Sequence, residues 1–308
     1  MSKLVVVGTV AFDAIETPFG KTGKILGGAG TFIGIAASFF NVDTTLVSIV
    51  GGDFPKAYLD LLQNKNIDIS NVEIVESGKT FFWEGKYHND MNKRDTLATE
   101  LNVLENFNPV VPEDYKNANV VMLGNLHPLT QLSVLDQMNE QPSLVVLDTM
   151  NFWMDNALDD LYEVIKRTDV ITINDEEARQ LTGEYSLVVA ARKIYEMGPE
   201  YVVIKKGENG ALLFYKDNAF FAPALPLEEV FDPTGAGDTF AGGFVGYLTK
   251  TEDFSFENMK NAVIYGSTLA SFSVEKFGTQ RMEHLTRDEV YHRLQEFKAL
   301  TQFDIKLA

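Results

Sequence analysis

The chain has 308 residues, 45% of them hydrophobic, which is enough for a sizeable buried core in one large domain or two smaller ones. Its 44 acidic against 26 basic residues give a formal net charge of −18, which argues against nucleic acid or an anionic membrane surface as the main partner. Cysteine is absent, so disulfides, thiolate zinc sites and a cysteine nucleophile are excluded. The N-terminus lacks the pattern of a signal peptide, and no apolar run reaches about 18 residues, so we expect a cytoplasmic protein.

Short runs rich in β-branched residues recur along the chain and predict buried strands. The runs are apolar throughout rather than alternating, which is typical of a sheet covered on both faces. They occupy residues 4–8, 44–50, 119–124, 143–148, 170–174 and 201–207.

Segments with helical periodicity lie between and after these strands. They occupy residues 29–40, 54–65, 128–139, 176–183, 186–198, 236–250, 256–274 and 286–300. Gly183 stands where one helix would end, and Thr286 with Glu289 forms a capping box at the start of the last. This alternation of strands and helices predicts an α/β fold with a doubly wound, mostly parallel sheet.

Residues 72–102 interrupt the alternation. The segment is polar, aromatic and β-prone, and it shows no helical period. Together with residues 10–26 it predicts a small antiparallel sheet that projects from the main body. A pair of surface hairpins is the alternative from pattern alone.

A glycine turn leads into the helix expected at 236–250. Gly235, Ala236 and Gly237 are small enough for backbone N–H groups to approach a ligand closely, and the first turn of a helix favours an anion. Asp238 follows in that turn, where a carboxylate can simply stabilise the helix dipole by about 0.3–1 kcal/mol. With a phosphoryl group on these N–H groups, Asp238 could instead accept the proton of an attacking hydroxyl.

The same helix contains Gly242 and Gly243 side by side. Each glycine inside a helix costs about 1 kcal/mol relative to alanine. We therefore expect another helix or a ligand to approach this helix closely.

The segment DPTGAGDTFAGGF, residues 232–244, closely resembles the C-terminal signature of the ribokinase-like (PfkB) family of carbohydrate and nucleoside kinases. The resemblance implies a ribokinase-like fold over residues 1–308, with a small β-sheet lid formed by about 10–26 and 72–104. In that family the glycine turn is an anion hole and its aspartate is the catalytic base. The catalytic residues so implied are Gly235, Ala236, Gly237 and Asp238.

Matching positions near the N-terminus are implied to bind the substrate. Asp13, in GTVAFD, matches an aspartate that binds sugar hydroxyls, and Gly27 and Gly28 match the diglycine hinge of the lid. By pattern alone these are a turn residue and a loop-to-helix bend. The family's usual asparagine is replaced here by Phe32, which makes no hydrogen bond and leaves the identity of the sugar open.

The resemblance also implies sites for nucleotide and metal. Asn174 and Glu177 match the family's N-x-x-E motif, in which the pair orders Mg²⁺ largely through water. The pattern alone favours an N-capped helix start, and it is the match of the glycine turn that favours the metal role. The implied nucleotide-binding residues are Asn174, Gly207, Gly210, Asn261 and Ala262. The positions matching a monovalent-cation loop for K⁺ are Asp232, Thr234, Ser273 and Gly278.

Other polar residues are weaker candidates. The family does not fix a lysine before Gly207, so neither Lys205 nor Lys206 is assigned a catalytic role. Residues expected at the carboxyl ends of strands, where ligands bind in open α/β sheets, are Asn125, His127, Asp148 and Asn151. The predicted lid contributes Trp83 and Tyr87, which could stack on a substrate, and Arg94, which could bind an anion. The two aromatic rings would also be needed simply to stabilise a two-stranded lid.

Several other functions are disfavoured. The GKT at residues 20–22 is no phosphate-binding loop, because Ile15 stands where the motif needs glycine. The histidines at 88, 127, 284 and 292 have no zinc-site spacing. A dinucleotide oxidoreductase is disfavoured because no G-x-G-x-x-G follows the first strand.

The implied function is transfer of the γ-phosphoryl group of ATP to a hydroxymethyl group of a sugar or sugar-like substrate, with Mg²⁺ and a candidate K⁺ site. A nucleoside kinase of the same family is the alternative, and a ligand-binding homologue without turnover is a further one. The expected partner is the small-molecule substrate, with no nucleic acid or membrane, and a homodimer through the lid is a further expectation.

Overall fold

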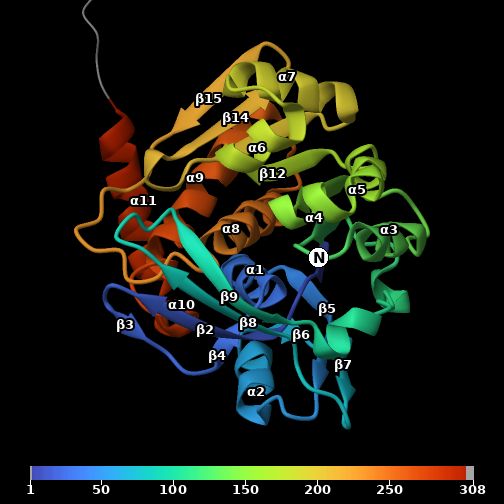
Figure 1. Cartoon of the computed structure of the whole chain (residues 1–308). Coiled ribbons are helices and arrows are strands. Elements are labelled where there is room, and N and C mark those ends of the chain that lie inside the picture. The colour runs from blue at the N-terminus through green and yellow to red at the C-terminus, as the bar shows by residue number, and fades with distance from the viewer. Residues whose placement is uncertain (1, 303–308) are drawn as a thin grey trace, which may run out of the picture.

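The computed structural model describes residues 2–302, and ten strands within them form the main sheet (Figure 1). In sheet order they are β15 (Asn218–Ala222), β14 (Ala211–Tyr215), β13 (Tyr201–Lys205), β12 (Val170–Asn174), β11 (Leu144–Asp148), β10 (Val120–Leu123), β1 (Lys3–Val7), β5 (Asp43–Gly51) and β6 (Ile67–Asp68), with β7 (Val72–Val75) also paired to β5. The strands from β13 to β6 run parallel, whereas β14 pairs in antiparallel fashion with both β13 and β15. The predicted doubly wound, mostly parallel sheet is therefore confirmed.

Both faces of this sheet are covered, which explains why its strands are apolar throughout. Leu4 and Val6 belong to the hydrophobic cluster on one face, and Val5 and Val7 to the cluster on the other. Neighbouring side chains of an extended strand point to opposite faces, so a strand buried on both sides needs apolar residues at every position.

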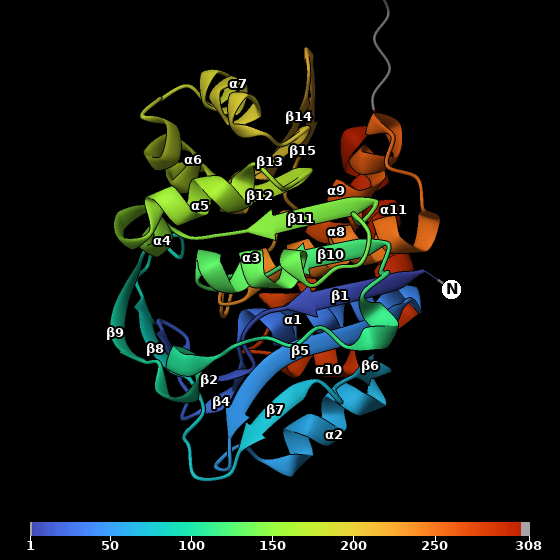
Figure 2. The same ribbon diagram turned by 90° about the vertical axis from the view of Figure 1, so that its right-hand side faces the viewer.

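Helices form a layer on each face (Figure 2). One layer contains α1 (Ala29–Ala37), α2 (Lys56–Asn64), α8 (Ala236–Thr251), α9 (Phe256–Ser273), α10 (Gln280–His284) and α11 (Arg287–Thr301). The other contains α3 (Pro128–Asp136), α4 (Asn151–Asn156), α5 (Leu158–Ile165), α6 (Asp175–Thr182) and α7 (Leu187–Met197). Short 3-10 helices are η1 (Ser38–Phe40), η2 (Asn102–Asn106), η3 (Glu113–Tyr115) and η4 (Gly207–Asn209).

Some elements were absent from the sequence prediction. Helices α4 and α10 have too few residues to show a period, and β15 has mixed burial because it lies at the sheet edge. Helix α5 carried a usable signal, since its apolar residues Leu161, Val164 and Ile165 recur at helical spacing and are buried. The predicted capping box of Thr286 and Glu289 and the left-handed Gly183 are both present.

A second, smaller sheet lies beside the carboxyl ends of β1, β10 and β11 (Figure 2). It contains β3 (Gly20–Lys21), β2 (Ala11–Thr17), β8 (Phe82–Tyr87) and β9 (Arg94–Glu100) in that order, with β4 (Ile25–Gly27) also paired to β2. The pairing of β2 with β8 is parallel, so the prediction of a purely antiparallel sheet was wrong. Between β2 and β8 in the sequence, the chain forms β5, β6 and β7 of the main sheet. This long connection allows β2 and β8 to run in the same direction.

The segment predicted as the second half of the small sheet is divided between the two sheets. Its first strand, β7, pairs in parallel with β5 of the main sheet, whereas β8 and β9 belong to the small sheet. Only part of residues 72–104 therefore projects from the main body.

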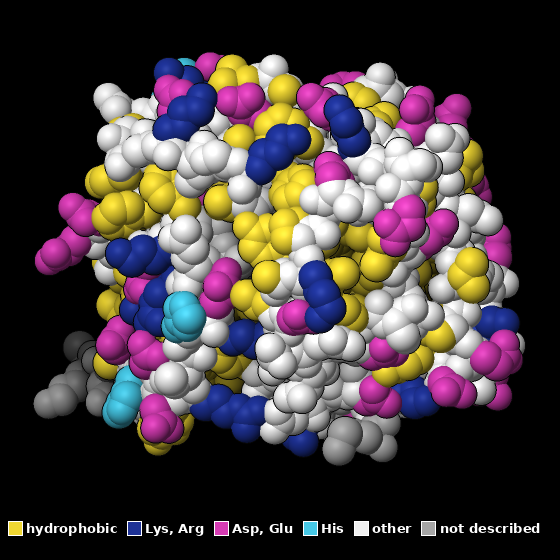
Figure 3. Space-filling view, turned by 90° about the horizontal axis from the view of Figure 1, so that it is seen from below, with side chains coloured by type: hydrophobic (Ala, Val, Ile, Leu, Met, Phe, Trp, Pro, Cys, Tyr) yellow, Lys and Arg dark blue, Asp and Glu magenta, His cyan; other side chains and the backbone are white. Residues whose placement is uncertain are grey.

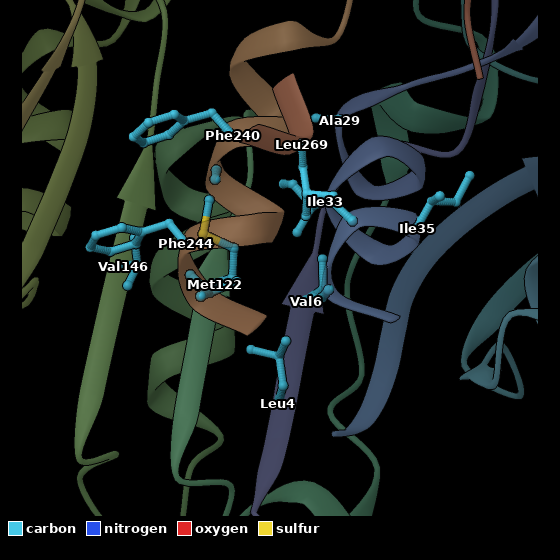
Figure 4. Packing of buried hydrophobic residues seen from close by; sticks show 14 of the residues in the cluster. Leu4, Val6, Ala29, Ile33, Ile35, Met122, Val146, Phe240, Phe244 and Leu269 are labelled. Carbon is cyan, nitrogen blue, oxygen red and sulfur yellow. The ribbon is translucent and has the colours of Figure 1, made fainter. Parts of the chain in front are cut away.

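The paired glycines of α8 are contact points between helices, as predicted. A Cβ on Gly242 would overlap the backbone oxygen of Ile33 in α1, and one on Gly243 would lie 3.0 Å from the Cα of Gly266 in α9. Figure 4 shows Phe240 and Phe244 of the same helix lying over the strands of the main sheet. The small residues thus let α8 pack closely between its neighbours, and this packing positions the helix N-terminus.

The negative charge is dispersed over the surface shown in Figure 3, where acidic side chains lie among basic and neutral ones. Within residues 2–302, no helix combines the length and apolar character that crossing a membrane requires.

Replacing Gly242 with alanine is expected to destabilise the fold. Alanine gains about 1 kcal/mol of helix propensity, but the new methyl group would overlap rigid backbone of α1, and overpacking costs about 1–3 kcal/mol or more. Because the overlap is with backbone, the cost should lie near the upper end of this range, and we expect chemical denaturation to show a net loss of about 2 kcal/mol in the free energy of unfolding. Gly23→Ala is the control, because no atom lies within 4 Å of a Cβ there. Equal stability of the two variants would contradict the packing argument.

Candidate functional site

Polar residues from several elements meet at the carboxyl edge of the main sheet. Asp148, Asn174 and Lys205 are the last residues of the adjacent strands β11, β12 and β13. The N-terminus of α8, with Asp238 in its first turn, belongs to the same group, because Asp238 interacts electrostatically with Asp148 and Lys205. Ligands bind at this edge in open α/β sheets, so the fold itself marks this region.

The glycine turn has the backbone conformation that an anion hole requires. Gly235 has φ 73°, a left-handed conformation, and a Cβ there would overlap the ring of Phe32. The N–H of Ala236 donates to the oxygen of Pro233 at 3.2 Å, which closes the turn. Among the described residues, the N–H groups of Gly235 and Gly237 have no hydrogen-bond acceptor. Two of the three predicted amides are thus available to a ligand.

Asp238 is partly buried behind this turn. The pKa of its carboxyl is raised to about 7, chiefly by burial and then by the charge of Asp148, while Lys205 and Arg94 oppose the shift. A carboxylate whose pKa lies near neutrality is a better proton acceptor than an ordinary aspartate.

The ion pair of Lys205 with Asp148 is the feature of the site that sequence reasoning missed. Lys205 Nζ lies 2.8 Å from Asp148 Oδ1, and both side chains are largely buried. Thr172, on the strand between them, also donates to Asp148 at 3.1 Å. Burial opposes the charge of Lys205, but Asp148 and Glu177 outweigh it, so the pKa of the ammonium is raised. Nothing in the sequence indicates that β11 and β13 lie on either side of the same strand.

Asp13 lies in β2 of the small sheet and is almost fully buried. Burial raises the pKa of its carboxyl to about 7, a hydrogen bond from Gly28 opposes this, and Asp232 and Asp238 add repulsion. A Cβ on Gly27 would overlap this carboxylate, so the predicted substrate-binding residues do lie together.

Asn174 and Glu177 form a reciprocal capping box at the start of α6. The side chain of Asn174 accepts from the Glu177 N–H, and that of Glu177 accepts from the Asn174 N–H, each at 2.8 Å. Burial raises the pKa of Glu177 to about 7, and the charge of Lys205 opposes this shift. Such a carboxyl would be stabilised in its ionised form by a nearby cation.

The predicted nucleotide-binding residues are spread over two elements. Gly207 begins η4 and Gly210 follows it, between β13 and β14. A Cβ on Gly207 would overlap the side chain of Asn92, in the turn between β8 and β9 of the small sheet. Asn261 is exposed on α9, whereas Ala262 is fully buried in the hydrophobic core. The position of Ala262 gives it a packing role in this structure.

The predicted K⁺-loop residues tie two loops together. Asp232 is fully buried and accepts from the N–H groups of Thr234 and Gly278, each at 2.8 Å. Ser273 donates to Ala270 within α9. The role of Asp232 as a link between these loops is visible, while a cation here remains a prediction.

The weaker candidates from the sequence analysis have different surroundings. Asn125 accepts from Trp153 at 2.8 Å, and His127 caps α3 and packs against the same indole. In the small sheet, Tyr87 accepts from Thr234 of the glycine-turn loop at 3.1 Å. Arg94 is exposed and lies over the ring of Trp83. Asn151 is exposed at the start of α4.

An open surface depression of about 470 Å³ lies elsewhere, along β5 and β7. Its charged lining consists of Glu73 and Lys79. The concentration of charged groups at the strand ends, rather than volume, therefore locates the candidate site.

Comparisons with known proteins show which proteins the chain resembles. A family model described as pfkB family carbohydrate kinase matches residues 1–285. The chain is 34% identical over 255 residues to a cytidine kinase from Thermococcus kodakarensis, covering 80% of this chain and 89% of that one. The crystal structure of Methanocaldococcus jannaschii nucleoside kinase covers 96% of this chain and 99% of its own, with a TM-score of 0.77 at 24% identity. A putative ribokinase II from E. coli in complex with ATP and Mg²⁺ covers 96% and 100%, with a TM-score of 0.77 at 19% identity.

The buried carboxyl of Asp13 is expected to make stability depend on pH. Its folded pKa of about 7 exceeds the ordinary value of 3.8, so the folded state holds a proton that the unfolded state releases between these pH values. Stability therefore falls as the pH rises through this window. Relative to the wild type, Asp13→Asn should gain about 2 kcal/mol in the free energy of unfolding between pH 5 and pH 8, measured by denaturation of the unliganded protein. Asp217→Asn, in an exposed turn, is the control and should show no such gain.

Proposed function

The chain belongs to the pfkB family of carbohydrate kinases, and on this premise we propose that it transfers the γ-phosphoryl group of ATP to the hydroxymethyl group of a nucleoside. The observation that carries the proposal is the position of Asp238, a carboxyl with its pKa raised to about 7 in the first turn of α8, behind two available amides. A base beside an anion site is what phosphoryl transfer to an alcohol needs.

In the proposed step, the substrate hydroxyl oxygen forms a bond to the γ-phosphorus while the bond from that phosphorus to the β,γ-bridging oxygen breaks. Asp238 takes the hydroxyl proton. The amides of Gly235 and Gly237 stabilise the negative charge on the phosphoryl oxygens, since such preorganised donors cost no rearrangement during the reaction.

The proposal of a nucleoside acceptor rests on the similarity to a cytidine kinase and on the place of Asp13. A buried carboxylate beside Gly27 and Gly28 is suited to accept hydrogen bonds from the hydroxyls of a ribose ring. Phe32 gives no information on the acceptor, because its ring is buried beneath Gly235 and not exposed to a ligand. Its presence in place of a polar residue is therefore explained by packing.

The donor set also fits a magnesium nucleotide. Mg²⁺ keeps several waters and needs only one or two protein oxygen ligands beside the phosphates. Glu177 and Asn174 would hold it, and Gly207 and Gly210 would lie along the nucleotide. When bound, Mg²⁺ would neutralise phosphate charge.

K⁺ beside Asp232 is also part of the proposal, and a comparison of activity in K⁺ and Na⁺ salts tests it.

The small sheet is proposed to act as a lid that excludes water. Its contacts of Asn92 with Gly207 and of Tyr87 with Thr234 support this role, because they join the small sheet to the proposed nucleotide and anion sites.

A homodimer through the small sheet is a further part of the proposal. Strand β9 lies at the edge of this sheet, so its outer side is open to pairing, and its Leu97 is 52% exposed. Light scattering of the protein in solution would measure its mass.

Removing the proposed base should abolish turnover and leave ATP binding nearly intact. We expect Asp238→Asn to lower kcat by about 10³-fold, with a small change in the Kd of MgATP measured by calorimetry. In the wild type, kcat/KM should rise as the pH increases through about 7, because only the ionised carboxylate accepts a proton. A variant that keeps its kcat would show that Asp238 is not the base.

A screen of acceptors distinguishes nucleosides from free sugars. With MgATP, we expect ADP release for one ribonucleoside at a kcat/KM about 100-fold above that of ribose or fructose. The 5′-deoxy form of the best nucleoside is the control, because it lacks the acceptor hydroxyl and should bind without turnover. The reverse ranking would make the acceptor a sugar. Background ADP release with every compound, despite ATP binding, would indicate a ligand-binding protein.

A further inference from the structure

Lys205 extends from the end of β13 to the glycine turn. Its Nζ lies 3.1 Å from the position that a Cβ would occupy on Gly237, and its side chain is only 16% exposed. The ammonium is therefore beside one of the two amides that have no acceptor among the described residues.

The ammonium is held in place but retains hydrogen-bonding capacity. Its hydrogen bond to Asp148 at 2.8 Å uses one of three N–H donors, and the described residues supply no second acceptor. Asp148 is itself fixed by Thr172 and by burial at the end of β11. The ion pair thus orients Lys205 and leaves two N–H groups for a ligand.

The charges around Lys205 are mostly negative. Asp148, Glu177 and Asp238 interact with it electrostatically, and Arg94 of the small sheet acts on Glu177 and Asp238 from the outer side. Without a buried cation, an anionic phosphoryl group would meet several carboxylates at this edge. A structural role, in which Lys205 only neutralises Asp148, is the competing explanation.

We propose that Lys205 is a catalytic residue whose ammonium, oriented by Asp148, contacts the phosphoryl group during its transfer and works with the amides of Gly235 and Gly237. The proposal rests on the proposed kinase function and deepens it. The Lys205 ammonium would add a full positive charge to the backbone dipoles of the anion hole, at a largely buried position where charge interactions are strong.

In the reaction, Lys205 stays protonated and exchanges no proton. The new bond joins the acceptor oxygen to the γ-phosphorus, the bond from phosphorus to the bridging oxygen of ADP breaks, and the hydroxyl proton goes to Asp238. Lys205 acts only on the oxygens of the phosphoryl group, where negative charge must be stabilised throughout the transfer. We therefore expect its loss to lower kcat more than it weakens nucleotide binding.

A double-mutant cycle tests this role. Steady-state kinetics with MgATP and the best acceptor from the panel are measured for the wild type, Lys205→Met, Asp148→Asn and the double variant. Lys205→Met should lower kcat by about 10²–10³-fold with little change in the Kd of ADP. In the Asp148→Asn background the same substitution should cause a smaller loss, still at least about tenfold, because the ammonium is then present but less well oriented. Lys206→Met is the matched control and should stay within about threefold of the wild type.

The outcomes separate the explanations. If Lys205 only neutralises Asp148, the double variant will match Asp148→Asn, and the proposal is overturned. Each single substitution leaves one buried charge without its partner, whereas the double variant removes both charges and so avoids this cause of misfolding. Melting temperatures verify that each variant is folded. A wild type without acceptor-dependent ADP release would overturn the proposed function itself, whereas an active wild type with an equally active Lys205→Met would overturn only the role of Lys205.

Discussion

The burial of several carboxyl groups at one edge of a parallel sheet is the constraint on which the rest of this structure depends. Asp13, Glu177 and Asp238 each have a pKa raised to about 7, and burial is the largest cause in every case. Charges removed from water need partners, so the fold surrounds these groups with backbone N–H groups and with Lys205. The same burial that costs stability also makes Asp238 a proton acceptor suited to neutral pH.

Close packing of small residues fixes the position of the α8 N-terminus, which carries Asp238. Gly242 and Gly243 let α8 approach α1 and α9, so the helix N-terminus is placed by rigid backbone rather than by a flexible loop. Beneath the turn, the ring of Phe32 fills the space against Gly235. A catalytic arrangement must keep its donors within a few tenths of an ångström, and contacts of this kind provide that precision.

The small sheet connects the parts of the site that lie far apart in sequence. Asn92 contacts the turn at Gly207, and Tyr87 accepts from Thr234 beside the glycine turn, while Asp13 lies in the sheet itself. A movement of this sheet would therefore change the surroundings of Gly207, of the glycine turn and of Asp13 together. These contacts support the proposed role of the small sheet as a lid, whose closure would assemble the proposed site.

The sequence by itself determined the elements whose signal is local. Apolar runs predicted the parallel strands, and the segment 232–244 was sufficient to predict a turn at the start of a helix with Asp238 inside it. It also predicted a second sheet, but not that β7 would pair with β5, because strand pairing depends on which backbone groups meet in space. Only the tertiary structure decided that β12 separates β11 from β13, and hence that Asp148 and Lys205 form an ion pair beside Gly237. An ion pair between residues 57 positions apart in the chain leaves no periodic or local pattern, since it arises from the order of strands across the sheet.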